Sequence, residues 1–272
     1  MGLRINTNVA ALNAARNLRG STLALNRTLE RLSTGLRINR AADDAAGLAI
    51  SESFRTVIRG SLVAQRNSQD GISLLQTAEG ALAETTNMLQ RIRELAVQAA
   101  NGTQSDNNRA SLDAEVQQLL AQIDDIAWDT EFNGVHVLSD IYSVTLQNGV
   151  HAGQNLVVTV SGASTRQLGI SAVTVSSMDS AVSALSTVDL ALRSVTGLRS
   201  QFGAQQNRLE FTISVLAIQE ENSSASDSAL RDADIARETI AFTRNQILVS
   251  SGTSVLAQSN VIPQTALQLL GG

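Results

Sequence analysis

Apolar residues recur at alternating intervals of four and three along several long segments of this chain. No other feature of the sequence restricts the fold as much, because this spacing places apolar side chains in one narrow stripe along a helix, as in coiled coils. A stripe is hidden from water only when another helix covers it. We therefore expect three central segments to share one buried seam. Its residues are Leu75, Ala78, Leu82, Leu89, Ile92, Ala96 and Ala99; Leu112, Val116, Leu119, Ile123 and Ile126; and Val188, Leu192, Val195, Phe202, Leu209, Ile213 and Leu216.

The composition favours long, closely packed helices. Hydrophobic residues make up 43% of the 272 residues but aromatic residues only 3%, so Ala, Leu, Val and Ile supply most of the apolar side chains. These residues suit a narrow helical seam better than a thick core around bulky rings. The chain has a single proline, so the commonest helix breaker is almost absent. The predicted fold class is mainly α, a long coiled-coil-like helical bundle.

Missing residue types exclude several kinds of chemistry. The chain has no cysteine, which excludes disulfides, zinc ribbons and thiol catalysis. All 20 basic residues are arginine, which excludes a Walker phosphate loop and Schiff-base catalysis because both need lysine. The net charge of −5 carries no signature of nucleic-acid binding, and no apolar run is long enough to predict membrane insertion. Residues 1–8 lack the apolar run of a secretory signal, so these features alone predict a cytoplasmic protein.

A small β element is predicted between about residues 134 and 177. Apolar residues alternate with polar ones over residues 142–146 and again over residues 156–160, which is typical of half-buried strands. Asn133-Gly134 and Asn148-Gly149 supply residues that favour tight hairpin turns. A separate polar stretch at residues 101–107 predicts the turn of a helical hairpin, with a serine or aspartate near its end capping the next helix.

The two ends of the chain carry narrower apolar stripes. A lone helix with such a stripe gains little stability in water, because tertiary packing supplies most of the stability of a helix. The ends therefore either pack on their own bundle or wait for partner chains. Pro263 falls on the C-terminal stripe and is expected to kink or end the helix there. The predicted seam consists of Ile5, Val9, Leu12, Leu25, Leu29, Leu32 and Leu36 at the N-terminal end and Ile235, Phe242, Val249 and Leu256 at the C-terminal end.

The two ends also carry opposite charge. Residues 1–42 contain seven arginines against one glutamate, a net charge of +6, whereas residues 220–238 contain six acids against two arginines, a net charge of −4. This complementarity suggests that the ends meet, within one subunit or between neighbours. A basic arm could instead bind a membrane or nucleic acid, but this arm lacks aromatic anchors. We expect residues 1–45 with 227–272 to form one terminal coiled-coil domain, and residues 46–226 to form the bundle domain.

The remaining titratable residues favour structural roles. Asp43 and Asp44 precede a segment of small residues, where aspartates usually cap a helix rather than bind a metal. Gly47 is expected to allow the close approach of a neighbouring helix. His136 and His151 belong to no metal-binding motif. No catalytic residue, cofactor or metal site is therefore predicted, and the chain is not expected to be an enzyme.

Seven longer motifs occur over roughly the first half and the last third of the chain. They are residues 4–14, 29–39, 43–51, 67–73, 89–98, 130–134 and 251–258. In sequence and in order, these motifs resemble those of bacterial flagellins. The resemblance implies a structural subunit whose N- and C-terminal helices pair as an inner coiled coil of the flagellar filament. Only about 50 residues separate Gly134 from the next helical pattern, so the chain resembles a minimal flagellin without variable outer domains.

The resemblance also implies a location and partners. Flagellins leave the cell largely unfolded through the flagellar type III apparatus, which replaces the cytoplasmic prediction with an extracellular one, and their termini order on polymerisation. The implied partners are further copies of the chain, the flagellar cap, the hook-filament junction protein and an export chaperone. Arg91, Leu95 and Glu115 match the pattern that contacts neighbouring subunits and Toll-like receptor 5. The alternatives are a hook-filament junction protein and a flagellin-like surface adhesin.

Overall fold

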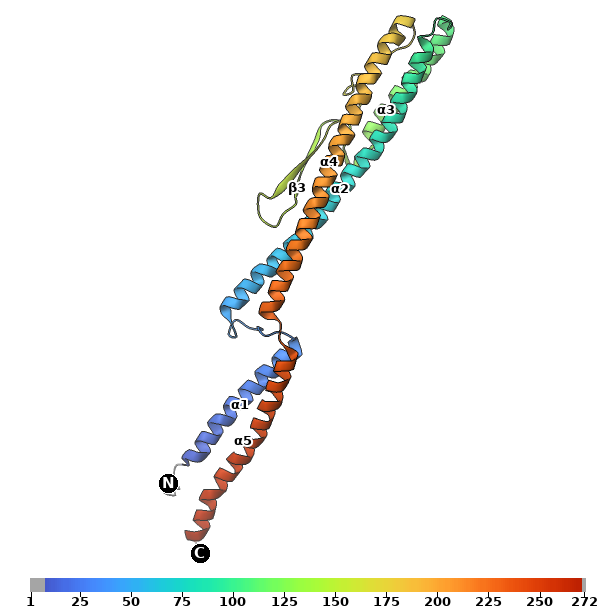
Figure 1. Cartoon of the computed structure of the whole chain (residues 1–272). Coiled ribbons are helices and arrows are strands. Elements are labelled where there is room, and N and C mark those ends of the chain that lie inside the picture. The colour runs from blue at the N-terminus through green and yellow to red at the C-terminus, as the bar shows by residue number, and fades with distance from the viewer. Residues whose placement is uncertain (1–7, 271–272) are drawn as a thin grey trace. The chain divides into compact units, whose positions relative to one another are not determined.

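The computed structural model describes the backbone of residues 8–270 and the side chains of residues 8–261. The chain divides into two compact units: unit 1 contains the chain up to Thr56 and from Asn222 onward, and unit 2 contains Val57–Glu221. Five helices account for most of the described chain (Figure 1). They are α1 (Val9–Thr34), α2 (Ala45–Ala99), α3 (Asp106–Asp129), α4 (Met178–Arg231) and α5 (Ile235–Leu270). The predicted fold class, a long helical bundle with paired terminal helices and a small β element, is confirmed. The predicted domain boundaries at residues 45/46 and 226/227 stay a prediction.

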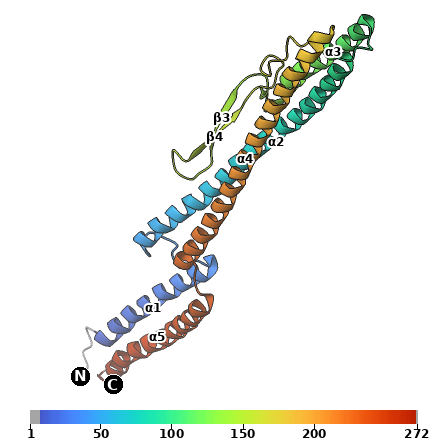
Figure 2. The same ribbon diagram turned by 45° about the horizontal axis from the view of Figure 1, so that its top comes forward.

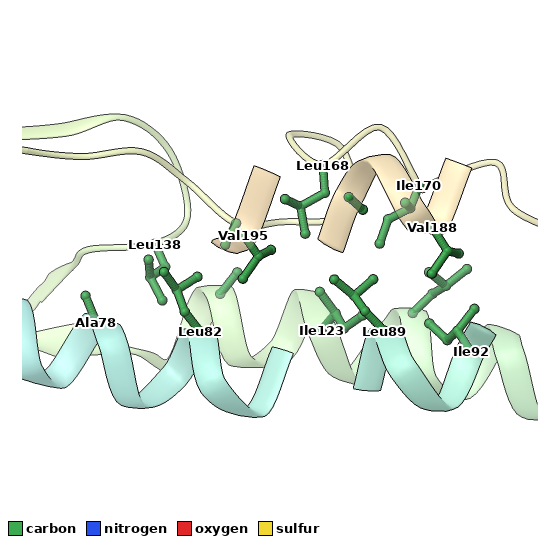
Figure 3. Packing of buried hydrophobic residues seen from close by; sticks show 14 of the residues in the cluster. Ala78, Leu82, Leu89, Ile92, Ile123, Leu138, Leu168, Ile170, Val188 and Val195 are labelled. Carbon is green, nitrogen blue, oxygen red and sulfur yellow. The ribbon is translucent and has the colours of Figure 1, made fainter. Parts of the chain in front are cut away.

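The core of unit 2 is one seam shared by α2, α3 and α4. Figure 3 shows Leu82 and Leu89 of α2 beside Ile123 of α3 and Val188 and Val195 of α4. Each of these five side chains is fully buried. Burying one such aliphatic side chain contributes roughly 1.5–3 kcal/mol, so the seam is the main source of stability of the bundle. Predicted members that are only partly buried, at the edge of this core, are Leu112, Leu119, Leu192 and Ile213.

The predicted helical hairpin between α2 and α3 is confirmed, and a buried arginine closes it. Ser105 is the N-cap of α3, and its side chain accepts a hydrogen bond from the backbone N–H of Asn108. Arg109 is 8% exposed, and its guanidinium group donates to the carbonyl oxygens of Ala99 at 2.9 Å and Asn101 at 3.1 Å. The Ala99 carbonyl ends α2 and has no partner within the helix, whereas the Asn101 carbonyl lies in the turn and also accepts from the backbone N–H of Gln104. Arg109 therefore caps one helix from the first turns of the next.

The β element consists of two antiparallel hairpins. Strands β1 (Glu131–Phe132) and β2 (Val135–His136) are joined by Asn133 and Gly134, whose φ angles of 52° and 75° are those of a type I′ turn. Strands β3 (Tyr142–Gln147) and β4 (Asn155–Val160) pair next, and the inward side chains of β4 are buried. The predicted strands and the Asn133-Gly134 turn are thus confirmed. At the second predicted turn, Gly149 has no positive φ; its Cβ would lie 2.4 Å from the Gln154 Cβ, so glycine is needed there for space.

The longer hairpin lies against α2 through a glycine in the helix. A Cβ atom on Gly71 would lie 2.3 Å from Cδ1 of Leu146, so any larger residue would require this leucine side chain to move. One turn earlier in α2, the side-chain amide of Asn67 donates to the carbonyl oxygen of Gln147 at 2.8 Å. Beyond β4, residues 161–177 form a loop. Asp124 holds it by accepting hydrogen bonds from the backbone N–H and hydroxyl of Thr165, both at 2.8 Å.

Candidate assembly interface

In unit 1, α1 and α5 run antiparallel, side by side (Figures 1 and 2). Asn8 caps the start of α1, and its side chain accepts a hydrogen bond from the N–H of Ala11 at 3.0 Å. Gly35 ends α1 in the left-handed conformation at φ 71°, which only glycine adopts without strain. Asp234 begins α5 by accepting from the N–H groups of Ala236 and Arg237. Both helices therefore start at the polar caps that their sequences supply.

The face of α5 that packs on α1 is partly polar. Asn245 and Ser259 are 7% and 9% exposed, and the Glu238 side chain is 15% exposed. At Gly252, a Cβ atom would lie 3.2 Å from Leu18 Cδ1, so α1 approaches closely there. These four positions recur every seven residues and alternate with the predicted apolar line. Sequence reasoning missed them because they are polar or small, although their spacing of seven was visible.

The matching face of α1 also mixes apolar and polar residues. Leu18, Leu25 and Leu32 are half-buried at intervals of seven. Thr28 is 7% exposed, and its hydroxyl donates to the carbonyls of Ala24 and Leu25 in its own helix. The buried hydroxyl is thus satisfied without a partner on α5, as a buried polar group requires. The α1–α5 pair is consequently a narrow seam with limited apolar area.

The predicted seam residues fall into two groups in the structure. Ile5 lies outside the described residues. Half-buried residues within unit 1 are Leu25, Leu32, Leu36, Phe242, Val249 and Leu256. Exposed residues are Val9 at 57%, Leu12 at 59%, Leu29 at 54% and Ile235 at 51%. The half-buried residues thus lie partly covered within one subunit, and the exposed residues face solvent in the single chain. Their role in polymerisation stays a prediction.

Both terminal helices expose large apolar side chains. The exposed set comprises Val9, Leu12, Leu23 and Leu29 on α1 and Ile235, Ile240, Ile247, Leu248, Val255 and Val261 on α5. Ile240, at 71%, and Ile247, at 60%, line a groove of about 450 Å³ together with Thr239, Thr243, Arg244 and Leu248. Exposed apolar side chains that gather as Ile240, Ile247 and Leu248 do are typical of an interaction site. We name these ten residues the outer apolar face.

One ion pair links the two oppositely charged ends within a single chain. Arg31 of α1 and Glu238 of α5 lie 3.0 Å apart, with side chains 32% and 15% exposed. Among the described residues, Arg16, Arg19 and Arg27 form no ion pair with an acidic side chain of their own chain. The predicted attraction between the ends thus has one direct contact inside the subunit. The remaining arginines leave α1 basic toward solvent.

Short backbone contacts join the ends of α1 and α4 within unit 1. Leu36 and Asp232 form an isolated antiparallel bridge, with Arg37 N–H donating to the carbonyl of Arg231 at 2.7 Å. The Ala233 N–H donates to the carbonyl of Gly35 at 2.9 Å. These hydrogen bonds fix where α5 starts relative to the end of α1. They connect the two halves of unit 1, which are far apart in the sequence.

The acidic residues near the start of α2 have structural roles. Asp44 caps α2 by accepting from Gly47 N–H at 2.9 Å, as predicted, whereas Asp43 accepts from the N–H groups of Arg40 and Asn39. The hydrogen bond from the backbone N–H of Arg40 lowers the pKa of the Asp43 carboxyl below its usual value. A Cβ on Gly47 would meet the Asp44 carboxylate at 2.4 Å, so this glycine accommodates its own cap. Ile38 Cδ1 would lie 2.8 Å from the same Cβ, so Gly47 packs against its own cap and the loop before α2 rather than against the expected neighbouring helix.

An acidic residue within α2, Glu52, contacts the end of α4. Glu52 forms ion pairs with Arg55 at 3.1 Å and Arg231 at 3.2 Å, and the hydrogen bond from Arg55 lowers the pKa of the Glu52 carboxyl below its usual value. At the preceding residue, the Ser51 hydroxyl donates to the Asp227 carboxylate at 2.6 Å. These contacts tie α2 and α4 together where both belong to unit 1.

The candidate receptor-contact residues lie in unit 2. Arg91 on α2 and Glu115 on α3 pair at 2.8 Å with both side chains about half exposed, and the hydrogen bond from Arg91 to Glu115 raises the pKa of Arg91. Leu95 is 1% exposed and belongs to the core of the bundle. The ionic pair is therefore on the surface, and Leu95 lies beneath that surface. Direct contact with a receptor is open only to Arg91 and Glu115 in this conformation.

Within the part of the chain that the structure describes, no group of three or more His, Asp or Glu side chains is arranged to hold a metal ion. Among residues 8–270, no helix has an apolar stretch long enough to cross a membrane.

Known proteins resemble this chain over nearly its whole length. Two family models match it: the bacterial flagellin N-terminal helical region over residues 5–143 and the bacterial flagellin C-terminal helical region over residues 185–270. The flagellin of Halalkalibacterium halodurans is 46% identical over 269 residues, covering 98% of this chain and 99% of that relative. The flagellar filament 31.3 kDa core protein of Treponema maltophilum is 41% identical over 283 residues with the same coverage.

One solved structure shares the fold at low identity. A putative flagellar hook-associated protein from Vibrio parahaemolyticus has a TM-score of 0.58 and 13% sequence identity, covering 70% of this chain and 100% of that one. This similarity concerns the fold alone.

Proposed function

Because this chain belongs to the bacterial flagellin family, we propose that it polymerises into the flagellar filament through the outer apolar face of α1 and α5. The chain is a structural subunit of the filament. One observation carries the proposed mechanism: ten large apolar side chains on the two terminal helices are exposed while those helices already pair with each other. Neighbouring copies are the partners that this face fits.

The energetic argument rests on the area that polymerisation would hide. Fully burying one large aliphatic side chain contributes roughly 1.5–3 kcal/mol, and about half of that remains available for a side chain that is already half covered. If half of the ten residues became buried in each subunit, the gain would be on the order of 5 kcal/mol before the cost of association. A filament subunit makes such contacts with several neighbours, so modest individual contacts suffice.

The seam between α1 and α5 supports coupling of order to assembly. Its α5 side contains Asn245, Gly252 and Ser259, which contribute little apolar area. A helix pair with such a seam has low stability alone and gains most from added contacts. We infer that residues 1–45 and 227–272 act as the assembly domain and become fully ordered in the filament.

The export route and the location that we propose for this chain are those of its family. We infer that the chain leaves the cell through the flagellar type III apparatus and becomes part of the extracellular filament. An exposed apolar groove such as the one around Ile240 and Ile247 is an aggregation hazard before assembly. An export chaperone that covers α5 would remove this hazard. The flagellar cap and the hook-filament junction protein complete the proposed set of partners, and no enzymatic role is proposed.

Arg91 and Glu115 support a second recognition surface. Their exposed ion pair lies on α2 and α3, where a neighbouring subunit or Toll-like receptor 5 could replace solvent around it. Leu95, which is buried below, would act by holding the helix surface in shape. The alternatives of a hook-filament junction protein and a surface adhesin are not favoured. The two flagellar relatives described above are more than 40% identical over almost the whole chain, whereas the hook-associated neighbour shares the fold alone.

Seeded elongation followed by electron microscopy tests the role of the outer apolar face. Ile247→Glu places a charge on a residue that is 60% exposed, so the subunit should fold normally while its elongation falls at least tenfold. Gln246→Glu adds the same charge at the adjacent exposed polar position and is the matched control. Normal elongation of Ile247→Glu would contradict this use of the face. Absence of elongation by the wild-type chain would contradict the polymer function itself.

A further inference from the structure

Asn8 contacts both terminal helices with the two halves of one side-chain amide. Its Oδ1 atom accepts from the N–H of Ala11 and so caps α1. Its Nδ2 atom donates to the carbonyl oxygen of Ser259 in α5 at 2.8 Å. The two residues are 251 positions apart in the chain. A single side chain thus links the first turn of α1 to the final third of α5.

The acceptor of this long-range bond has lost its normal partner. In an α-helix, the carbonyl of residue 259 accepts from the N–H of residue 263. Residue 263 is proline, which has no N–H. Of the two expected outcomes, a kink or an end of the helix, the end does not occur, because α5 continues to Leu270. Ser259 is only 9% exposed, so water has little access to the vacant carbonyl. A buried carbonyl without a donor is destabilising, so another donor is required.

We propose that Asn8 is a positioning residue for assembly, supplying the hydrogen bond that Pro263 withholds and thereby fixing the register of α1 against α5. This inference rests on the proposed polymerisation through the terminal helices. A slip of one helical turn moves the donor about 5.4 Å, which no hydrogen bond tolerates. The cap of α1 is local, but the Ser259 carbonyl receives its donor from the first turn of α1, so α5 is satisfied at this point only when α1 lies beside it in this register.

The chemistry of the side chain explains why asparagine stands at this position. Serine, threonine and aspartate cap helices about as well as asparagine does. Aspartate has no donor when ionised, and the hydroxyl of serine is too short to cap α1 and reach α5 at once. Asparagine alone among these caps carries an acceptor and a donor at the end of the same planar group. The residue that caps α1 therefore also determines where α1 meets α5.

A double-mutant cycle separates this role from simple capping. Asn8→Asp keeps the acceptor for Ala11 and removes the donor to Ser259, while Pro263→Ala returns a backbone N–H to α5. We expect Asn8→Asp to raise the critical concentration for seeded elongation about fivefold to tenfold in the Pro263 chain. The increase should be less than about twofold in the Pro263→Ala background, where the helix supplies its own donor. Asn8→Ser, which adds no charge, should follow the same pattern.

Asn13→Asp is the matched control, since Asn13 is an exposed residue of α1 whose side chain makes no hydrogen bond among the described residues. An equal effect of Asn8→Asp in both backgrounds would overturn the proposal, because capping and charge would then explain it. The same double-mutant cycle can be measured without polymerisation by following the hydrogen exchange of the α5 backbone amides in the full-length monomer. The register contact and the polymer function can therefore fail separately.

Discussion

Arg109→Ala is the most direct test of how the helical bundle of unit 2 is held. Arg109 is 8% exposed, and its guanidinium group donates to the carbonyl oxygens of Ala99, at the end of α2, and of Asn101, in the turn that follows. It also pairs with Asp106 at 3.1 Å. Alanine removes all three contacts and takes the guanidinium donor from both carbonyls, although the Asn101 carbonyl still accepts from the backbone N–H of Gln104. The change leaves the apolar seam itself intact.

The expected loss follows from the exposure of each contact. A hydrogen bond from a charged group contributes about 1.5–3 kcal/mol, so the two carbonyl contacts together contribute about 3–6 kcal/mol. Asp106 has a side chain that is 96% exposed, and its ion pair adds less than about 1 kcal/mol. Water entering the shortened side chain's place recovers part of the loss. We expect Arg109→Ala to lower the free energy of unfolding by about 3 kcal/mol.

Urea unfolding measures this loss with two signals. Circular dichroism follows the helices, and the fluorescence of Trp128, the single tryptophan of the chain, follows unit 2. Arg193→Ala is the matched control, because Arg193 is exposed on α4 and makes no ion pair among the described residues. If Arg109→Ala costs no more than the control, the buried guanidinium is not what closes the hairpin.

Two further predictions concern unit 1. Gly252→Leu should raise the critical concentration for elongation at least about tenfold, because even a Cβ there would lie 3.2 Å from Leu18 Cδ1. Gly252→Ala, which gains about 1 kcal/mol of helix propensity, should stay within about threefold, and similar values for both would contradict close packing. The pKa of Glu52 is lower in the folded protein than in the unfolded chain. The ionised carboxylate therefore stabilises the fold fully above about pH 4.5, the region of the unfolded-state pKa. This contribution is lost as the pH falls through the folded-state pKa. Glu52→Gln should therefore reduce the fall in Tm between about pH 5 and pH 3, and an unchanged pH dependence would refute the argument.

Much of the bundle was predictable because helical periodicity is a local property of the sequence. The four-three spacing identified residues such as Leu82, Ile123 and Val195 as one seam, and all three are fully buried. Turn residues were equally local, since Asn133-Gly134 fits the type I′ turn that joins β1 and β2. Family motifs in the correct order added the expectation of a filament subunit.

The sequence by itself determined which segments are helical, where their caps lie and which apolar stripes must be covered. Only the tertiary structure decided which stripe residues face the partner helix and which remain exposed, because burial depends on the position of the second helix. It also identified polar contacts that no hydropathy pattern marks, among them Asn8 with Ser259 and Arg109 with Ala99. The physical reason is that a hydrogen bond between distant residues depends on three-dimensional placement, whereas a helical period depends on neighbours along the chain.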